Sequence, residues 1–450
     1  MTPLLSFIAL LPRLLLGFCI VHFIWNATDG KSLLIKIFLS AAIGFGVSSL
    51  LGFLWIWLGL PLIAYVIFES VMSVILTGWL LLKNRDVIRS IKFPKLSVTI
   101  WGTLLFAGVL VFVFNLVLYS RQFPHGRPDA WINWNVAARF IYLGGADWQS
   151  TFLRQYDHPD YPLFTAVANA ITWTFLGSTS TWGPIAFHLV ISIFTAGSLF
   201  ALVNFFRDFK QASLAGILFM ALPFVIDQGM RQYADLLLAY IFLSAGGLTL
   251  LYIQTKESRI ALLTGLLIGL GGWAKNEGIS AILGLSLGWT LIAVKVERSA
   301  LKNYIFGLLF PLVVIALFKL FLAPSTDLFS AQGNSLTKIF DLSRYLLILK
   351  VAGSTLWDLG GLPLPLIGLI IFAAILIGRT VDRKPGTWTI GLFAAFQLAV
   401  YFVIFLLTPN DLLWHLNTSL DRLYLHVLPL LLLWFFIWLK SPQEFSPKVS

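Results

Sequence analysis

The sequence contains little charge and almost no cysteine. Only 11% of its 450 residues are Asp, Glu, Lys or Arg, whereas soluble domains carry about 25%. So few charged side chains cannot cover a water-exposed surface, which excludes a soluble globular protein. The single cysteine, Cys19, excludes an intrachain disulfide bond and a zinc site built from cysteines. The chain also lacks the G-x-x-x-x-G-K-[ST] phosphate loop, which excludes an ATP-driven pump of the P-loop type.

Long apolar runs make up most of the chain instead. Hydrophobic residues account for 58% of it, and residues 96–120 read LSVTIWGTLLFAGVLVFVFNLVLYS. A helix needs roughly 20 apolar residues to cross a bilayer, and many segments reach that length. We therefore predict an all-α, polytopic integral membrane protein with about 13 transmembrane helices.

Basic residues predict which loops face the cytoplasm. Lys and Arg collect in cytoplasmic loops, and KNRDVIRSIKFPK (83–95) holds five basic residues and one acid. Counting spans from this loop places residues 119–161 on the outer face, provided that residues 162–177 return there as an interfacial or re-entrant segment. The predicted parts are N-terminal helices with the basic loop (1–95), a larger transmembrane module (96–440) and a cytoplasmic tail (441–450).

The predicted outer loop 119–161 mixes charged and aromatic side chains. Its segment AWINWNVAARFIYL predicts a short amphipathic helix along the membrane, with Pro128 in the first turn. Rings that stack on a sugar, beside groups that bind its hydroxyls, are typical of a carbohydrate site. The alternative is an aromatic belt that anchors the loop at the interface. The candidate sugar or acceptor contacts are Trp131, Trp134, His158, Tyr161 and, from a later segment, Glu277.

Three carboxylates of this loop are candidates for catalysis. One positioned carboxylate can deprotonate an acceptor hydroxyl during an in-line, inverting displacement at an anomeric carbon. Asp129 is the first candidate, and Asp157 and Asp160 of DHPDYP are the others. The structural alternatives are that Asp129 caps a helix and that Asp157 or Asp160 pairs with Arg154. The scattered histidines and carboxylates leave the use of a divalent metal open.

Three cations at predicted outer helix ends could steady the charge of a phosphate leaving group. With a second pKa of about 6, such a phosphate needs no general acid. Arg422 is preferred, because a guanidinium fork binds phosphate oxygens in pairs; Lys275 and Arg231 are the others. Lys275 could instead pair with Glu277. Asp235, close to Arg231, could simply complement a helix dipole.

Taken in chain order, these segments resemble a known family. An acid in the first large outer loop is followed by HPDYPL, YADL, KNEG and TSLDRL before the last helix. In this order residues 96–440 look like the GT-C class of membrane-embedded glycosyltransferases. The most similar branch is the bacterial one that includes relatives of the dolichyl-phosphate-mannose (protein mannosyltransferase) and aminoarabinose transferases.

The resemblance implies a GT-C-like fold and an inverting glycosyltransferase in the inner (plasma) membrane, with its active site on the periplasmic face. The donor would be a polyprenyl-phosphate sugar, the acceptor a glycan or lipid, and Asp129 the catalytic acid of the family. Many members carry two adjacent acids there, whereas Ala130 follows Asp129 in this chain. A second acid would have to come from Asp157 or Asp160. Some members use a divalent metal and others do not.

Two other functions remain open. An O-antigen polymerase or ligase, which uses a lipid-diphosphate donor, predicts a large outer loop late in the chain, and the loop 323–342 is modest. A transporter or flippase predicts charges in mid-span, where Glu69 and Lys319 are the main examples. Because basic loops explain the net charge of +11, we expect membrane lipids and no nucleic acid as partners.

Overall fold

The computed structural model describes residues 2–83, 99–153, 158–295, 298–324, 336–382 and 384–445. Within these ranges the chain is helical and forms no β-strand; a single bridge joins Arg379 and Leu439. The same residues include nine helices long and apolar enough to cross a membrane, or up to ten if one bent pair counts as a span. The chain is thus an all-α protein of the multi-pass membrane class. The total of about 13 spans stays a prediction.

The first two helices, α1 (Thr2–Ile24) and α2 (Gly30–Trp57), form a hairpin. A third helix, α3 (Leu62–Lys83), packs beside it. α1 and α2 touch backbone to backbone, because glycines lie at the crossing. A Cβ on Gly17 would lie 1.9 Å from the carbonyl oxygen of Ser40. The predicted basic loop that follows falls mostly outside the described residues.

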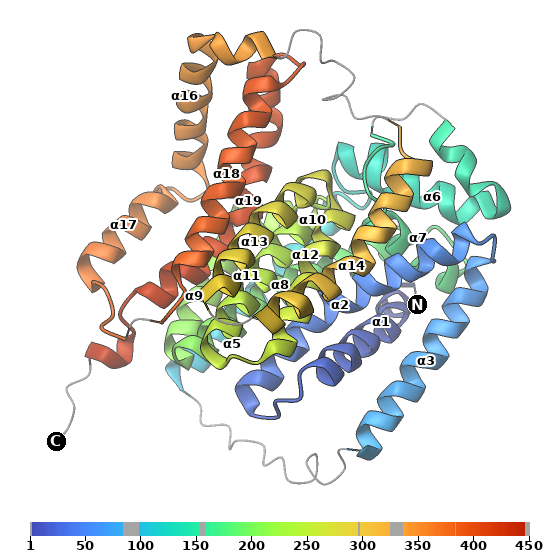
Figure 1. Cartoon of the computed structure of the whole chain (residues 1–450), viewed down its shortest axis with the longest axis horizontal. Helices are drawn as coiled ribbons and strands as arrows, with labels where there is room; N and C mark the ends of the chain where they lie inside the picture. Colours follow the sequence, from blue (N-terminus) through green and yellow to red (C-terminus); the bar gives the residue numbers. More distant parts are fainter. Residues whose placement is uncertain are drawn as a thin grey trace.

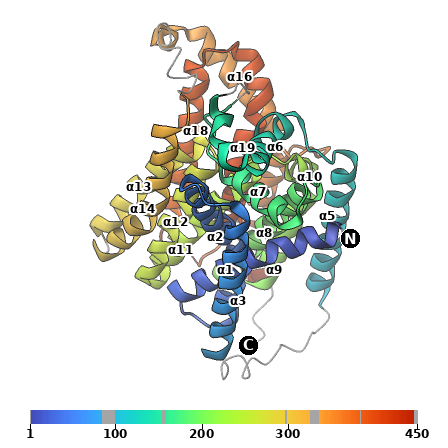
Figure 2. The same ribbon diagram turned by 90° about the vertical axis from the view of Figure 1, so that its right-hand side faces the viewer.

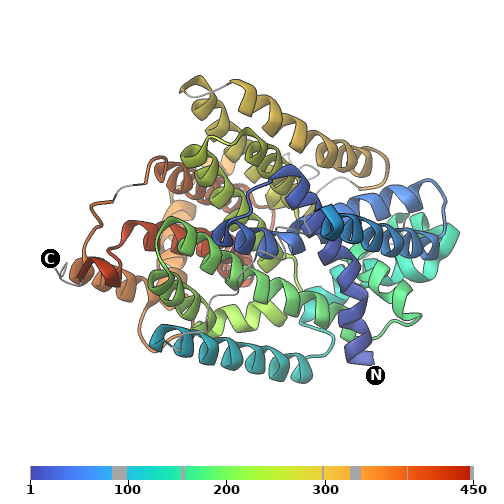
Figure 3. The same cartoon turned by 90° about the horizontal axis from the view of Figure 1, so that it is seen from below.

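Four helices follow along one side of the molecule: α5 (Ile100–Gln122), α8 (Trp182–Phe206), α9 (Phe209–Ala221) and α10 (Pro223–Met230). α5 runs along the edge, as the teal helix of Figure 3 shows, and buries little of its surface. α9 and α10 meet at an angle of 66°, because Pro223 cannot continue the hydrogen bonding of α9.

The centre consists of α11 (Asp235–Thr255), α12 (Ser258–Ala274), α13 (Asn276–Lys295) and α14 (Arg298–Phe321) (Figure 1). α11 is buried along nearly its whole length. The sequence pair Gly265 and Gly269 predicts close helix packing, and this is confirmed: a Cβ on Gly265 would lie 1.9 Å from the carbonyl oxygen of Tyr304 in α14.

The last helices stand to one side of this centre: α16 (Leu342–Asp358), α17 (Leu366–Ile377), α18 (Trp388–Leu407) and α19 (Leu412–Trp438). α16 reaches the upper edge of the molecule in both Figure 1 and Figure 2. At the opposite end, Arg207 after α8 donates hydrogen bonds to Thr380 Oγ1 and to the Leu439 carbonyl, both at 3.1 Å. These bonds tie the end of α19 and the α17–α18 connection to the centre.

The loop 119–161 is largely helical. The predicted helix in AWINWNVAARFIYL is confirmed as a π-helical turn, η1 (Ala130–Trp134), that runs into α6 (Asn135–Gly144). A 3₁₀ segment, η2 (Gly145–Leu153), follows. The next helix, α7 (Phe164–Leu176), has 13 residues, which is roughly 20 Å and too short to cross a bilayer. Its burial among other helices favours the re-entrant alternative over the interfacial one.

We expect Gly265→Ala to destabilise the protein by about 1–3 kcal/mol, because the added methyl meets backbone that cannot rotate away. The matched control is Gly288→Ala on α13, where a Cβ meets nothing within 4 Å. Thermal unfolding in detergent should show a lower Tm for Gly265→Ala alone. Equal Tm values for the two variants would contradict the close α12–α14 contact.

Candidate functional site

Charged side chains from distant segments meet at one end of the bundle. We call this cluster the polar site; it consists of Asp129, Asp235, Lys275, Glu277, Arg422 and His426. Helix ends bring most of them there: α11 begins at Asp235, and Lys275 lies in extended backbone between α12 and α13. Gly278 makes that sharp break possible, because a Cβ there would lie 2.0 Å from the Gly271 carbonyl oxygen.

Asp129 and Arg422 form the exposed side of the polar site. Arg422 Nη1 donates to Asp129 Oδ2 at 2.5 Å, and the two side chains are 17% and 37% exposed. The Asp129 side chain makes no capping hydrogen bond to the helix that follows, so the capping alternative finds no support. The sequence offered the two residues for separate reasons, and the structure brings them together.

Tyr233 contacts both members of this ion pair. The Arg422 guanidinium lies 5.4 Å from the centre of the Tyr233 ring, and the Tyr233 hydroxyl accepts a hydrogen bond from the Asp129 backbone N–H at 3.3 Å. Burial, together with the nearby Asp129 charge, raises the pKa of Tyr233 to about 12. The hydroxyl therefore stays protonated and neutral beside the ion pair near neutral pH.

Lys275 is held between two carboxylates. Its Nζ lies 2.8 Å from Asp235 Oδ1 and 2.7 Å from Glu277 Oε1. Burial alone disfavours the ammonium, but the two anions outweigh that effect and raise the pKa of Lys275 above its usual range. The predicted alternative, a pair with Glu277, is therefore confirmed, with Asp235 as a second partner. Lys275 contributes a fixed positive charge beneath the exposed pair.

Two residues of this region were given no role from the sequence: His426, which NTSLDRLYLHVLP places at the outer face with Arg422, and Tyr401, which was missed. His426 Nε2 lies 2.9 Å from Asp235 Oδ1, and Tyr401 OH lies 2.7 Å from His426 Nδ1. The four-residue spacing of Arg422 and His426 puts both on one face of α19, a signal that could have suggested His426. Tyr401 belongs to another helix, α18, and no sequence pattern marks it.

Asp160 lies in a separate hydrogen-bonded group beside the polar site. Asn276 Nδ2 donates to Asp160 Oδ2 at 2.7 Å, and Lys319 Nζ donates to Asn276 Oδ1 at 2.8 Å. Lys319, which the sequence suggested as a mid-span charge, lies two residues from the end of α14. These bonds fix Asp160 to the start of α13. Asp157 and its possible partner Arg154 lie outside the described residues.

The aromatic candidates divide into buried and exposed rings. Tyr161 stacks between Trp134 and His158, with ring centres 5.1 Å and 4.5 Å away. Trp134 is buried, whereas Trp131 is 55% exposed. The three stacked rings therefore hold one another in place, whereas the Trp131 ring is open to a ligand.

Arg231 belongs to a neighbouring group of ion pairs. It lies 2.5 Å from Asp227 and 3.8 Å from Asp421. Gln228 also donates to Asp421, at 3.2 Å. The described contacts of Arg231 thus join α10 to α19 rather than reach Asp129.

Local backbone conformations bring the GRPDAWINWN stretch against the start of α11. Gly126 has a positive φ of 76°, and a Cβ there would lie 2.5 Å from the Arg231 carbonyl oxygen. Only glycine allows this approach. Gln232 also has a positive φ, 62°, and its side chain accepts from Asn135 Nδ2 at 2.9 Å. Asn169 donates in turn to Asn135 Oδ1 at 3.0 Å. This amide chain fixes the loop to α7.

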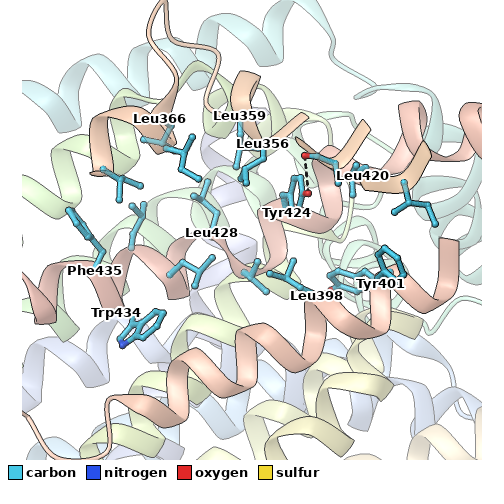
Figure 4. Close-up of a pocket in the computed structure, with 18 of the residues that line it drawn as sticks. Leu356, Leu359, Leu366, Leu398, Tyr401, Leu420, Tyr424, Leu428, Trp434 and Phe435 are labelled. Carbon is cyan, nitrogen blue, oxygen red and sulfur yellow. Dashed lines mark hydrogen bonds between the residues drawn. The ribbon is translucent and has the colours of Figure 1, made fainter. Parts of the chain in front are cut away.

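An apolar cavity of about 630 Å³ lies between the last four helices (Figure 4). Tyr401 and Leu420 lie toward one end of it, and Trp434 and Phe435 lie toward the other. α19 lines the cavity with one face, whereas its other face carries Arg422 and His426. The cavity and the polar site are therefore two sides of the same helix.

Within the described ranges, no group of three or more His, Cys, Asp or Glu side chains is placed to hold a metal ion. No match to this chain was found among protein-family models, curated proteins or solved structures. The chemistry of the site must therefore be argued from its geometry.

We expect Lys275→Met to destabilise the protein by about 3–5 kcal/mol, because two buried carboxylates lose their cation. Lys350→Met, which changes an exposed residue of α16, is the control and should alter stability by about 0.5 kcal/mol or less. Unfolding in denaturant measures both effects. If the two variants unfold alike, Lys275 does not hold the polar site together.

Proposed function

We propose that the chain is an inverting glycosyltransferase that moves a sugar from a polyprenyl-phosphate carrier to a glycan or lipid acceptor at the outer face of a membrane. One observation carries this proposal: Asp129 and Arg422, 293 residues apart in sequence, meet at the exposed side of a buried cluster of charged side chains. Sugar transfer from a phosphate requires a base for the acceptor hydroxyl and a cation for the phosphate within the same site.

The reaction follows from these two groups. Asp129 accepts the proton of the acceptor hydroxyl as the oxygen of that hydroxyl attacks the anomeric carbon. The bond from that carbon to the phosphate oxygen breaks on the opposite face, and its electron pair leaves with the phosphate. The configuration at the anomeric carbon is therefore inverted. Arg422 stabilises the phosphate by charge-assisted hydrogen bonds, and Lys275 offsets part of the negative charge of Asp235 and Glu277 beneath it.

The Arg422–Asp129 contact links donor binding to base activity. A phosphate that binds the Arg422 guanidinium competes with Asp129 for the same N–H groups. Asp129 loses its strongest hydrogen bond as a result, and its carboxylate becomes a better proton acceptor. The donor therefore prepares the base, so we propose that donor binding precedes deprotonation of the acceptor.

The apolar cavity gives the polyprenyl chain a place. Apart from two tyrosines and two tryptophans, its walls are mainly leucine, isoleucine, valine and phenylalanine, which suits an isoprenoid chain. α19 faces the cavity with Leu420 and the polar site with Arg422, so a lipid whose phosphate binds Arg422 would have to pass around the edge of this helix for its chain to reach the cavity. We assign the cavity to the donor lipid.

A transport function is less well supported. The buried charges of the N-terminal helices include Arg13 in α1, which donates to the Ala168 carbonyl and to Thr172 Oγ1, both at 2.8 Å. These bonds fix α7 to α1, which gives Arg13 a structural role. Glu69 accepts from Tyr65 at 3.2 Å.

A lipid-diphosphate donor has the same anionic headgroup chemistry as a lipid-monophosphate donor. The assay below distinguishes the two donors.

We expect Asp129→Asn to lower turnover by about 10²–10⁴-fold while donor binding persists, because the base is lost and Arg422 remains. The assay uses the full chain in nanodiscs, radiolabelled polyprenyl-phosphate and polyprenyl-diphosphate sugars, and crude envelope acceptors. Asp147→Asn, an exposed acid of the same loop, is the control and should keep wild-type turnover. Unchanged turnover in Asp129→Asn would move the base to Asp157 or Asp160. A folded wild type that transfers no sugar from any monophosphate would refute the proposal.

We expect Arg422→Gln to weaken donor binding by about 10–100-fold, since a charge-assisted hydrogen bond contributes about 1.5–3 kcal/mol. Arg121→Gln, which removes an exposed guanidinium near the same end, should change the affinity by less than about twofold if it acts only through screened surface charge. Binding of polyprenyl phosphate in nanodiscs measures both. Equal losses would show that Arg422 acts only through net charge.

A further inference from the structure

Three buried side chains connect the apolar cavity to the polar site: Tyr401, His426 and Asp235, which we call the relay. A carboxylate can only accept, so the 2.9 Å contact places the proton of His426 on Nε2. In a neutral imidazole, Nδ1 is then an acceptor, and the Tyr401 hydroxyl donates to it at 2.7 Å. Asp235 Oδ1 also accepts from Lys275 Nζ at 2.8 Å. The hydrogen bonds of the relay thus run from Tyr401 through His426 to Asp235, which also accepts from the Lys275 ammonium.

Burial makes this chain stiff. Tyr401, His426 and Asp235 are 2%, 0% and 1% exposed. Water cannot replace a lost partner in such a place, so breaking one bond leaves a buried polar atom unsatisfied. Each member is therefore held in one orientation by the next.

Tyr401 belongs both to the wall of the cavity and to the side that faces the polar site. Its ring lines the cavity, as Figure 4 shows, while its hydroxyl bonds to His426. The other tyrosine of the cavity, Tyr424, donates instead to the Ala352 carbonyl of α16 at 3.1 Å and stays on the cavity side. The two tyrosines share the apolar wall, but Tyr401 also belongs to the relay.

We propose that the relay sets the register of the bound lipid: Tyr401 lines the wall along which the hydrocarbon chain lies, and the relay fixes Lys275, which lies beneath the phosphate bound by Arg422, at a set distance from that wall. Tyr401 and His426 are positioning residues in this proposal and do not touch the phosphate. The inference rests on the proposed function, because it takes the occupant of the cavity to be the donor lipid. It adds that recognition of the headgroup depends on a hydroxyl in the cavity wall.

A role in register has a distinctive signature. If Tyr401 is only part of the wall, removing its hydroxyl changes the binding of a charged lipid and of its uncharged counterpart equally. If the relay positions Lys275, the same removal weakens binding of the phosphate more than that of the alcohol. The diagnostic quantity is therefore the ratio of the affinities for undecaprenyl phosphate and undecaprenol.

The experiment compares this ratio for the full chain in nanodiscs of neutral lipid. We expect Tyr401→Phe to lower the ratio about tenfold, because His426 Nδ1 loses the hydrogen bond that holds the relay, and with it Lys275, in one orientation. Tyr424→Phe, the matched control, should keep the ratio within about twofold even if both lipids bind more weakly. His426→Gln, whose amide can still donate to Asp235, should keep more of the ratio than His426→Ala. Thermal unfolding checks that each variant is folded.

Each outcome decides between the proposals. An unchanged ratio in Tyr401→Phe, or an equal fall in Tyr424→Phe, would overturn the relay and leave the glycosyltransferase standing. A wild type that prefers the phosphate but transfers no sugar would refute the proposed function, while the relay is still judged by the ratio. A folded wild type that does not prefer the phosphate over the alcohol would overturn both.

Discussion

The arrangement of the helices around the polar site depends on one buried ammonium between two carboxylates. Lys275 and Glu277 lie at the α12–α13 junction and Asp235 lies at the start of α11, and none of them could stay charged there alone. Two anions and one cation leave an excess of negative charge, which the nearby guanidinium of Arg422 offsets. The break between α12 and α13, the start of α11 and the position of α19 are thus fixed by the same electrostatic requirement.

The sequence allowed the class and the local elements to be predicted, because both depend on patterns within short segments. Apolar run length indicated an all-α membrane protein, period 3.6 indicated the helix after Asp129, and Gly265 with Gly269 indicated a close helix contact. Residue type alone also selected Asp129 and Arg422. That they contact each other could not be predicted, since 293 residues separate them and only the tertiary fold brings α19 to the loop.

Other features of the site depend on the direction in which each side chain points, which the sequence does not give. Trp131 and Trp134 look alike in sequence, yet one is exposed and the other buried, because the π-helical turn changes the angle between successive side chains. Tyr401 carries no motif and becomes relevant only through His426. The cavity arises between four helices whose sequences are uniformly apolar, so no single segment could reveal it.

The length of α17 has a consequence for how substrate arrives. Its 12 residues rise about 18 Å, against a hydrocarbon core of roughly 30 Å, so this wall of the cavity covers only part of the bilayer depth. The proposed donor lipid would therefore enter sideways from its own leaflet without passing through water. Supply is then diffusion in two dimensions, and saturation follows the mole fraction of the lipid in the membrane rather than its concentration in the suspension.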